Sequence, residues 1–404
     1  MEISTLNVDV RNNIRNYTIF KFENKDELKK AVDLWCNDKE EALKYYGHIS
    51  TWNTSLITDM SGLFKKKEKF NDNINNWDVS NVLNMSEMFD DAEKFNQPLN
   101  SWNVSSVTNM EYMFNRACLF NQPLNSWNVS SVTDMSYMFN EAVSFIQPLN
   151  NWNVSSVTNM ECMFRNSTFN QPINTNTVIR DDGTTYTAWD VSNVINMKGM
   201  FNEAIIFKQN ISEWNVSNVN DMSFMFYGAQ NFNENISQWN VSNVTTMRGM
   251  FSGASLFNQD ISQWNVSNVK SMENMFWKVS SFNQPINSWN VSSVTDMNSM
   301  FRKASSFNQP LNSWNVSNVT DMGYMFSGTS SFNQDISKWN VSKVRYARWM
   351  FRDAISFNKN NIPSLFNKDD DLKFIFPEPE KKFNDTVPSR ELYGREEPEG
   401  CNIS

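Results

Sequence analysis

The sequence has few of the residue types from which catalytic and metal sites are usually built. Its 404 residues include one histidine and four cysteines. The cysteines, Cys36, Cys118, Cys162 and Cys401, lie far apart and form no CxxC pair. This spacing argues against a disulfide framework or a zinc site, and it favours a reducing compartment. His48 has no cysteine or Ser/Asp partner spaced around it, so we expect a turn or packing role for it.

Long hydrophobic runs and clusters of basic charge are also missing. No apolar run approaches the roughly 18 residues that span a bilayer. The first residues, MEISTLNVDVRNNIRNYTIFKF, contain no apolar stretch of the kind that marks a secretory signal. The net charge is −9, and no basic stripe favours nucleic acid as a partner. We therefore expect an intracellular protein, of the cytoplasm, a host cytoplasm or a virion, that does not bind nucleic acid.

Catalytic motifs are missing as well. The sequence contains no phosphate-binding glycine loop, no metal-ligand cluster and no nucleophile–base constellation. Carboxylate pairs such as Asp90 and Asp91 fit solvated loops. We expect a protein without enzymatic activity, cofactor or metal ion.

Methionine, phenylalanine and tryptophan are abundant instead, with 23, 31 and 15 copies. They recur in a unit of 25 residues that is repeated twelve times along the chain. Counted from its tryptophan, a unit has Val at the second and fifth following positions, Met at the eighth and eleventh, and Phe at the twelfth, with few exceptions. The tryptophans that mark the units are Trp52, Trp77, Trp102, Trp127, Trp152, Trp189, Trp214, Trp239, Trp264, Trp289, Trp314 and Trp339.

The spacing predicts secondary structure for each unit. In Leu124–Val129, Trp and Val alternate with polar residues, which predicts a short strand with one buried face. From Val132 to Ala142 the apolar residues are three and four apart, as on one stripe of a helix. Pro148 marks the returning turn. Each unit is expected to be strand, short helix and turn, which makes the fold class α/β.

A single unit cannot bury these side chains, whereas stacked units can. We expect a solenoid in which identical positions form ladders of Trp on Trp, Phe on Phe and Met on Met. The Asn or Asp after each Trp, such as Asn128, is expected on the outer face of the sheet, bonded to its own copies above and below. The Ser two residues later, such as Ser130, is expected to satisfy backbone groups at a corner.

The array is expected to have distinct ends. We divide the chain into an N-terminal segment 1–23, a helical cap 24–50, the solenoid 51–362, and a C-terminal cap with a disordered tail, 363–404. Two short amphipathic helices are expected over 24–46, and the apolar stripe of the first is Leu28, Ala31, Val32 and Trp35.

The fifth unit carries an insertion at 174–188. Its residues alternate on both sides of Asp-Asp-Gly, which predicts a hairpin. The hairpin is either a contact device or an insertion that a loop tolerates.

The last four residues, Cys401-Asn402-Ile403-Ser404, have the C-a-a-X form that directs farnesylation of the cysteine. The alternative is an ordinary free cysteine. A single prenyl chain gives reversible peripheral membrane association, and the flanking residues are acidic, so a second membrane signal or a membrane-bound partner would be needed.

The repeated text WNVSSVTNMEYMFNRACLFNQPLN is similar to the 25- to 26-residue repeat of the BspA-like leucine-rich-repeat surface-protein family, which also occurs in mycoplasma-type lipoproteins and in large DNA viruses of protists. The likeness covers residues 24–362. It implies a leucine-rich-repeat-like, right-handed solenoid and, for bacterial members, surface adhesion and protein binding. The chain departs from that setting because it has no signal peptide and no N-terminal lipobox cysteine.

We therefore expect a non-enzymatic protein–protein interaction scaffold, tethered to a membrane through Cys401. The alternative is a surface adhesin or a structural component of a virion. Recognition is expected at positions that vary between units. On the strands these are Glu213, Gln238, Gln263 and Lys338. On the helices they are Tyr112, Tyr137, Phe224, Arg248 and Tyr324.

Overall fold

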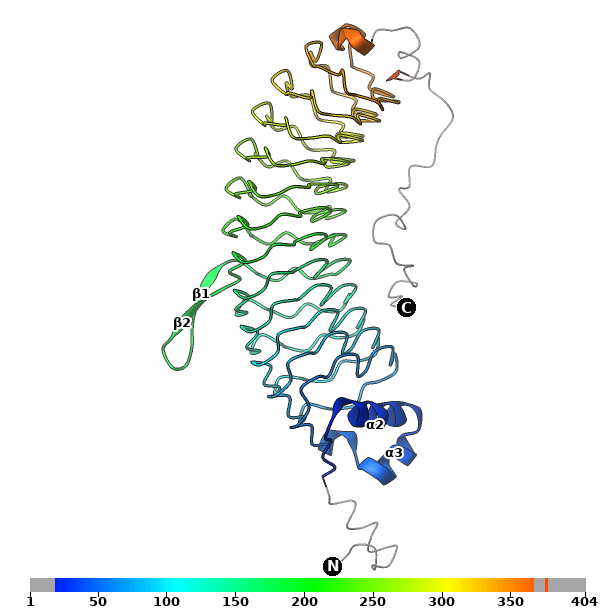
Figure 1. The fold of residues 1–404 in the computed structure, drawn as a ribbon, viewed down its shortest axis with the longest axis vertical. Helices are drawn as coiled ribbons and strands as arrows, with labels where there is room; N and C mark the ends of the chain where they lie inside the picture. Colours follow the sequence, from blue (N-terminus) through cyan, green and yellow to red (C-terminus); the bar gives the residue numbers. More distant parts are fainter. Residues whose placement is uncertain (1–18, 367–374, 377–404) are drawn as a thin grey trace, which may run out of the picture.

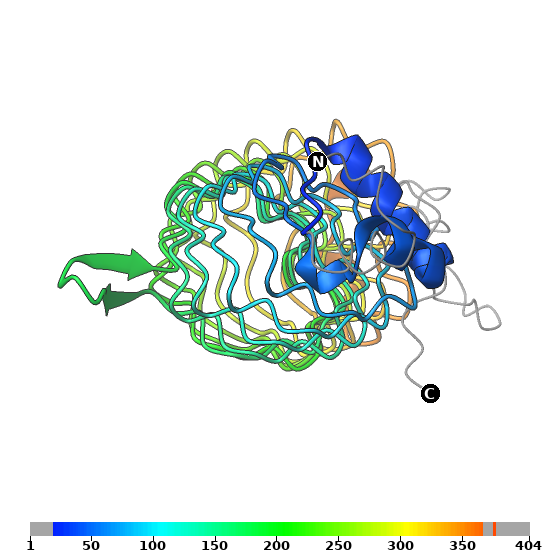
Figure 2. The same ribbon diagram turned by 90° about the horizontal axis from the view of Figure 1, so that it is seen from below.

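The computed structural model describes residues 19–366 and 375–376. The repeats are successive coils of one elongated stack that curves gently along its length (Figure 1). Seen along the stack, the coils superpose as a ring (Figure 2). Parallel bridges join successive coils at one equivalent position, from Asp59 with Asn84 to Asp321 with Tyr346. The tandem sequence therefore forms a repeat fold in which each unit packs on its neighbours.

The strand expected inside each unit does not form. In the fourth coil the amide of Trp127 donates to the carbonyl of Leu124 at 3.0 Å, and the amide of Val132 donates to that of Val129 at 3.0 Å. Each bond closes a tight turn where an extended strand was expected. Residues 127–129 lie between these two turns, and there Trp127 and Val129 are buried while Asn128 between them is exposed.

The helix expected over Val132–Ala142 does not form either. We call residues 134–141, and the eight equivalent residues of each other coil, the ladder segment. Alternate amides in it, beginning with Met135 and Tyr137, donate to carbonyls of the next coil at 2.7–3.0 Å. The amides between them close turns within the coil, as from Met138 to Met135 at 3.2 Å. A helix would bond its amides within its own coil and leave the coils unjoined.

Two residues of each ladder segment, the fourth and the eighth, have a left-handed backbone. In the fourth coil they are Tyr137 and Glu141, each with φ 56°. This conformation costs an ordinary residue about 1 kcal/mol. Glycine removes that cost in the eighth coil, at Gly249 and Gly253. Because a left-handed residue interrupts a helix, the pattern gives a second reason why the expected helix is absent.

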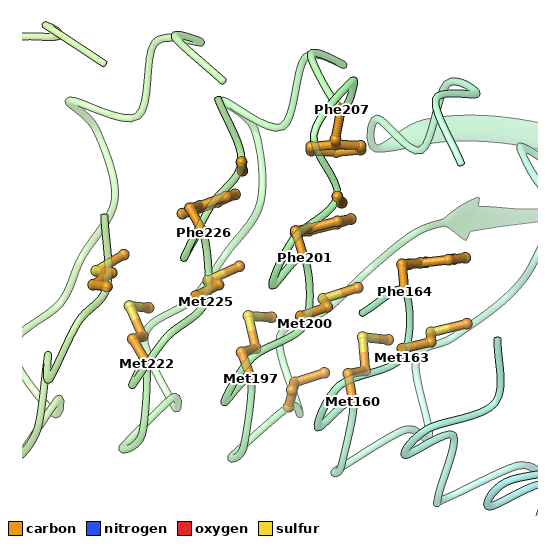
Figure 3. Close-up of a cluster of buried hydrophobic side chains, with 14 of the residues drawn as sticks. Met160, Met163, Phe164, Met197, Met200, Phe201, Phe207, Met222, Met225 and Phe226 are labelled. Atoms are coloured by element: carbon orange, nitrogen blue, oxygen red, sulfur yellow. The ribbon is translucent and has the colours of Figure 1, made fainter. Parts of the chain in front are cut away.

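The repeated apolar side chains fill the interior of the stack. Figure 3 shows Met160, Met163 and Phe164 of one coil in register with Met197, Met200 and Phe201 of the next. The rings of Trp102 and Trp127 stack 6.3 Å apart between centroids, with 5° between their planes. Phe114 and Phe139 stack at 5.7 Å. The expected ladders of identical side chains are confirmed, and each member is almost completely buried.

Asparagine and glutamine side chains join successive coils, but not at the residue after each tryptophan, where the sequence predicted an amide ladder. Asn128 forms no amide ladder, because its Oδ1 accepts from the amide of Ser130 in the same turn at 3.3 Å. The amide ladder forms at the FNQ segment. There, Oδ1 of Asn258 accepts from the amide of Asn283 at 2.9 Å and from Nε2 of Gln284 at 3.0 Å. The asparagines of these two positions therefore form hydrogen bonds that hold the turns and join the coils.

The two expected N-terminal helices are confirmed as α2 (Lys25–Asn37) and α3 (Lys39–Tyr46). The side chain of Asn24 caps α2 by accepting from the amide of Glu27 at 3.0 Å. Figure 1 shows both helices at one end of the stack, and η2 (Ile49–Thr51) leads into the first coil. The residues of α2 that pack against this end are the expected ones, Leu28, Ala31, Val32 and Trp35.

The hairpin expected in the fifth unit is also confirmed. Its strands are β1 (Asn176–Ile179) and β2 (Thr185–Ala188), which pair antiparallel with Asn176 opposite Ala188. Figures 1 and 2 show it projecting from the side of the stack.

The C-terminal end of the stack is covered in part by η3 (Lys359–Asn361) and η4 (Ser364–Phe366). The carbonyl of Ile375 accepts from the amide of Phe351 in the twelfth coil at 3.1 Å. The expected disordered tail and Cys401 lie outside the described residues. The cysteine spacing argued against a disulfide framework; among the described cysteines Cys36 and Cys162 are free, and Cys118 is disulfide-bonded.

Candidate partner-binding surface

The ladder segments of successive coils form a continuous surface, which we call the ladder face. The second, fifth and sixth residues of a segment are the repeated Met, Met and Phe, whose side chains are buried in the core; the exceptions are Leu63 in the first coil and the half-buried Ala347 in the twelfth. The third, fourth, seventh and eighth residues differ from coil to coil. The bridges hold the backbone of these variable residues in register, so side chains far apart in the sequence become neighbours along the face.

The structure divides the expected binding residues into two groups. Tyr112, Tyr137, Phe224 and Tyr324 all occupy the fourth position of a ladder segment, and Arg248 occupies the third. These five lie on the ladder face. The residues expected on strands are exposed in the turn before each tryptophan and are not part of this face: Glu213, Gln238, Gln263 and Lys338.

In the N-terminal half of the ladder face, the variable side chains bind one another. The rings of Tyr112 and Tyr137 stack with centroids 4.4 Å apart. The hydroxyl of Tyr137 donates to Glu161 at 3.1 Å, and Nζ of Lys198 lies 2.9 Å from the same carboxylate. Burial raises the pKa of the Tyr137 hydroxyl. Arg116 and Asp91 form an ion pair at 2.6 Å.

In the middle of the face, one aromatic ring covers a glycine. The Phe224 ring lies so close to Gly249 that a Cβ there would stand 2.6 Å from it. The guanidinium of Arg248 lies over the same ring at 5.4 Å, and its Nε is 2.8 Å from a carboxylate oxygen of Glu273. Burial raises the pKa of Glu273 in spite of this cation. Phe224 is buried, so it can present little area to a partner.

The C-terminal coils carry a group that we call the cationic aromatic cluster. Arg302 lies over the Tyr324 ring at 4.8 Å and over the Trp277 ring at 5.9 Å. Tyr324 meets Trp349 edge to face at 5.3 Å. Arg348 and Arg352 lie over the Trp349 ring at 4.1 and 4.9 Å. The members of the cluster are Trp277, Arg302, Tyr324, Arg348, Trp349 and Arg352.

Sequence reasoning found only Tyr324 in this cluster. The other members stand at the third, fourth or seventh position of their ladder segments. A comparison of equivalent positions between the units could have identified them, because these positions change from unit to unit while the adjacent Met and Phe do not.

Charge is concentrated at the same end. Residues 338–353 hold five cations and one acid, which is a net charge of +4 in a chain whose net charge is −9. The cations are Lys338, Lys343, Arg345, Arg348 and Arg352, and the acid is Asp353. The twelfth coil is therefore strongly basic within an acidic protein, which favours an acidic ligand at this end.

A groove of about 460 Å³ lies between the hairpin and the neighbouring coils. Tyr186 of β2 donates from its hydroxyl to the carbonyl of Asn151, and the Arg180 guanidinium lies over the Tyr186 ring at 4.6 Å. These contacts hold the hairpin against the coils. Asn125, Asn153 and Asp182 also line the groove.

Reactive thiols and metal-ligand groups do not assemble in the part of the chain that the structure describes. Burial raises the pKa of Cys36 to about 11 and that of Cys162 to about 12. Both thiols are therefore protonated at neutral pH. Within residues 19–366 and 375–376, three or more His, Cys, Asp or Glu residues never gather as a metal site would need. The helices of this same part are all too short or too polar to cross a bilayer.

Comparison with known proteins adds a family match. A family model described as "Mycoplasma protein of unknown function, DUF285" matches residues 35–134, 105–184, 177–288 and 270–388. The overlapping matches together run from residue 35 to residue 388. A search of curated proteins and a search of solved structures found no match to the chain.

Proposed function

Because the chain belongs to the DUF285 family, a repeat family of unknown function, we propose that it is a non-enzymatic scaffold that binds a protein partner through the C-terminal part of the ladder face. The proposal includes two finer points. The stack is a right-handed, leucine-rich-repeat-like solenoid, and the family is close to the BspA-like repeat proteins.

One observation carries the proposal: the side chains of each coil separate into a fixed framework and a variable face. The framework side chains pack in the core and form hydrogen bonds between coils. One example is the bond from the indole nitrogen of Trp239 to the carbonyl of Ile211 at 3.1 Å. The variable face ends in the cationic aromatic cluster. Arginine, tryptophan and tyrosine are the residues most enriched in binding hot spots. The exposed guanidinium of Arg348 lies over Trp349, so one partner group can meet charge and ring together.

Site-directed photo-crosslinking tests the proposal. A photoreactive phenylalanine analogue would replace Tyr324 in the full chain, and Gln238, exposed outside the ladder face, would carry it in the control. We expect a saturable crosslinked species from position 324 that disappears when Trp349→Ala is added, and none from position 238. Equal crosslinking at both positions, or a species that persists with Trp349→Ala, contradicts the proposed surface.

We further propose that farnesylation of Cys401 tethers the scaffold to a membrane. The support is the C-a-a-X form of its last four residues. Intact-mass analysis of the protein from its native cell, compared with Cys401→Ser, tests this. A gain of one farnesyl group with loss of the last three residues is expected. An unmodified C-terminus, or a disulfide between Cys401 and Cys118, contradicts the tether.

A further inference from the structure

We propose that the acidic, proline-containing C-terminal segment of the same chain, residues 377–399, binds the cationic aromatic cluster and so competes with an external partner. The inference rests on the proposed function for its choice of surface. It adds an occupant for that surface and a form of regulation, in which the scaffold is open only when the segment is displaced.

Charge complementarity is the first argument. Residues 377–404 contain seven acids and four bases, which is a net charge of −3. Three of these acids, Glu396, Glu397 and Glu399, stand within four residues. The twelfth coil has a net charge of +4 over residues 338–353. Carboxylates bind arginine through paired, charge-assisted hydrogen bonds, and an arginine that lies over an aromatic ring keeps its N–H edge available for them.

The point at which the segment begins is the second argument. The ring of Phe376 stacks on Phe351 of the twelfth coil with centroids 5.2 Å apart, and Nζ of Lys359 lies 5.1 Å from the Phe376 ring centroid. The segment therefore starts on the coil that carries Arg348 and Arg352. Its 23 residues, 377–399, can reach up to about 80 Å when extended, so the whole cluster is within range. A tether of this length gives a high effective concentration.

The residue types of the segment give the third argument. The segment contains four prolines, Pro377, Pro379, Pro388 and Pro398, and each proline restricts the free chain and so lowers the entropy lost on binding. A proline ring also packs well against a partly exposed aromatic ring. Tyr324 and Trp349 offer two such rings, and the neighbouring arginines suit the glutamates between the prolines.

Proteolysis of the full-length chain tests the inference. Trypsin cleavage after Arg390 would be followed by mass spectrometry at low and at high salt. We expect cleavage at low salt to be about tenfold slower than at high salt, because cleavage follows the population of the released segment. The variant Arg348→Glu/Arg352→Glu should be cleaved at low salt as fast as the wild type at high salt. The control Lys270→Glu, an exposed cation outside the ladder face, should keep the protection.

A second variant, with substitutions in the C-terminal segment and none in the coils, tests the same inference if Arg348→Glu/Arg352→Glu folds poorly. Glu396→Gln/Glu397→Gln/Glu399→Gln leaves every coil unchanged and creates no new trypsin site. It should lose the protection to the same extent. Equal cleavage rates for the wild type and this variant at low salt would overturn the inference. The crosslinking at position 324 would then still decide the proposed function independently.

Discussion

The indole nitrogen of Trp239 donates a hydrogen bond to the carbonyl oxygen of Ile211 in the preceding coil at 3.1 Å. The same bond recurs along the stack, for example from Trp264 to Ile236 at 3.1 Å and from Trp314 to Ile286 at 2.9 Å. It explains why the repeat uses tryptophan where another large apolar residue could fill the same volume. The ring packs in the core while its N–H group satisfies a buried carbonyl of the neighbouring coil.

Trp239→Phe should therefore destabilise the protein by more than its loss of volume suggests. The smaller ring leaves a cavity and the Ile211 carbonyl without its donor. We expect the free energy of unfolding to fall by about 2–4 kcal/mol. Urea unfolding followed by circular dichroism measures it. Gln238→Ala, at the exposed neighbouring residue, should change it by less than about 0.5 kcal/mol. A similarly small effect of Trp239→Phe would contradict the role of the bond.

Gly249→Ala and Gly253→Ala separate backbone strain from steric contact. Both glycines are left-handed, with φ 58° and 73°. A Cβ at Gly249 would stand 2.6 Å from the Phe224 ring, whereas at Gly253 the nearest atoms are 3.5 Å away. We expect Gly249→Ala to cost about 1–2 kcal/mol more than Gly253→Ala. In a double-mutant cycle, Phe224→Ala should remove this excess. Equal costs at the two glycines would show that the ring moves aside freely.

Ile146→Asn should stabilise the protein by restoring a missing step of the asparagine ladder. Asn121 Oδ1 accepts from the Ile146 amide at 3.1 Å, but Ile146 has no acceptor to offer the next coil. An asparagine there would offer one to the amide of Asn170. The expected gain in unfolding free energy is about 0.5–1.5 kcal/mol. Ile146→Ala, which removes the exposed side chain without adding an acceptor, is the control and should show no gain.

Asp296→Asn should change how stability depends on pH. Burial, with repulsion from Asp321, raises the pKa of Asp296 above its ordinary 3.8. The native state thus holds this proton more tightly than the unfolded state, so the contribution of Asp296 favours folding at low pH and is lost as pH rises through the raised pKa. Urea unfolding at about pH 4, 5.5 and 7 should show the variant gaining on the wild type as pH rises. A difference that stays constant or shrinks would contradict the shift.

The sequence alone determined the repeat, its apolar ladders, the N-terminal helices and the hairpin. The helices and the hairpin depend on local patterns, and the ladders depend on identity between units. Trp102 packs on Trp127 because tryptophan occupies the same position in both units. The stripe of α2 and the Asp-Asp-Gly turn are such local patterns. Tyr324 could be named as a binding residue for the same reason, since its position varies between units.

Only the tertiary structure decided the backbone of each coil and the neighbours of Tyr324. Steps of three and four residues fit a helix and also fit the turns of the ladder segment, and the choice depends on whether the Tyr137 amide bonds within its coil or to Glu161 of the next. That bond exists only once coils stack. Arg302 and Trp349 meet Tyr324 from coils on either side, about 25 residues away along the chain. No local pattern encodes such a meeting, because it arises from the register between coils.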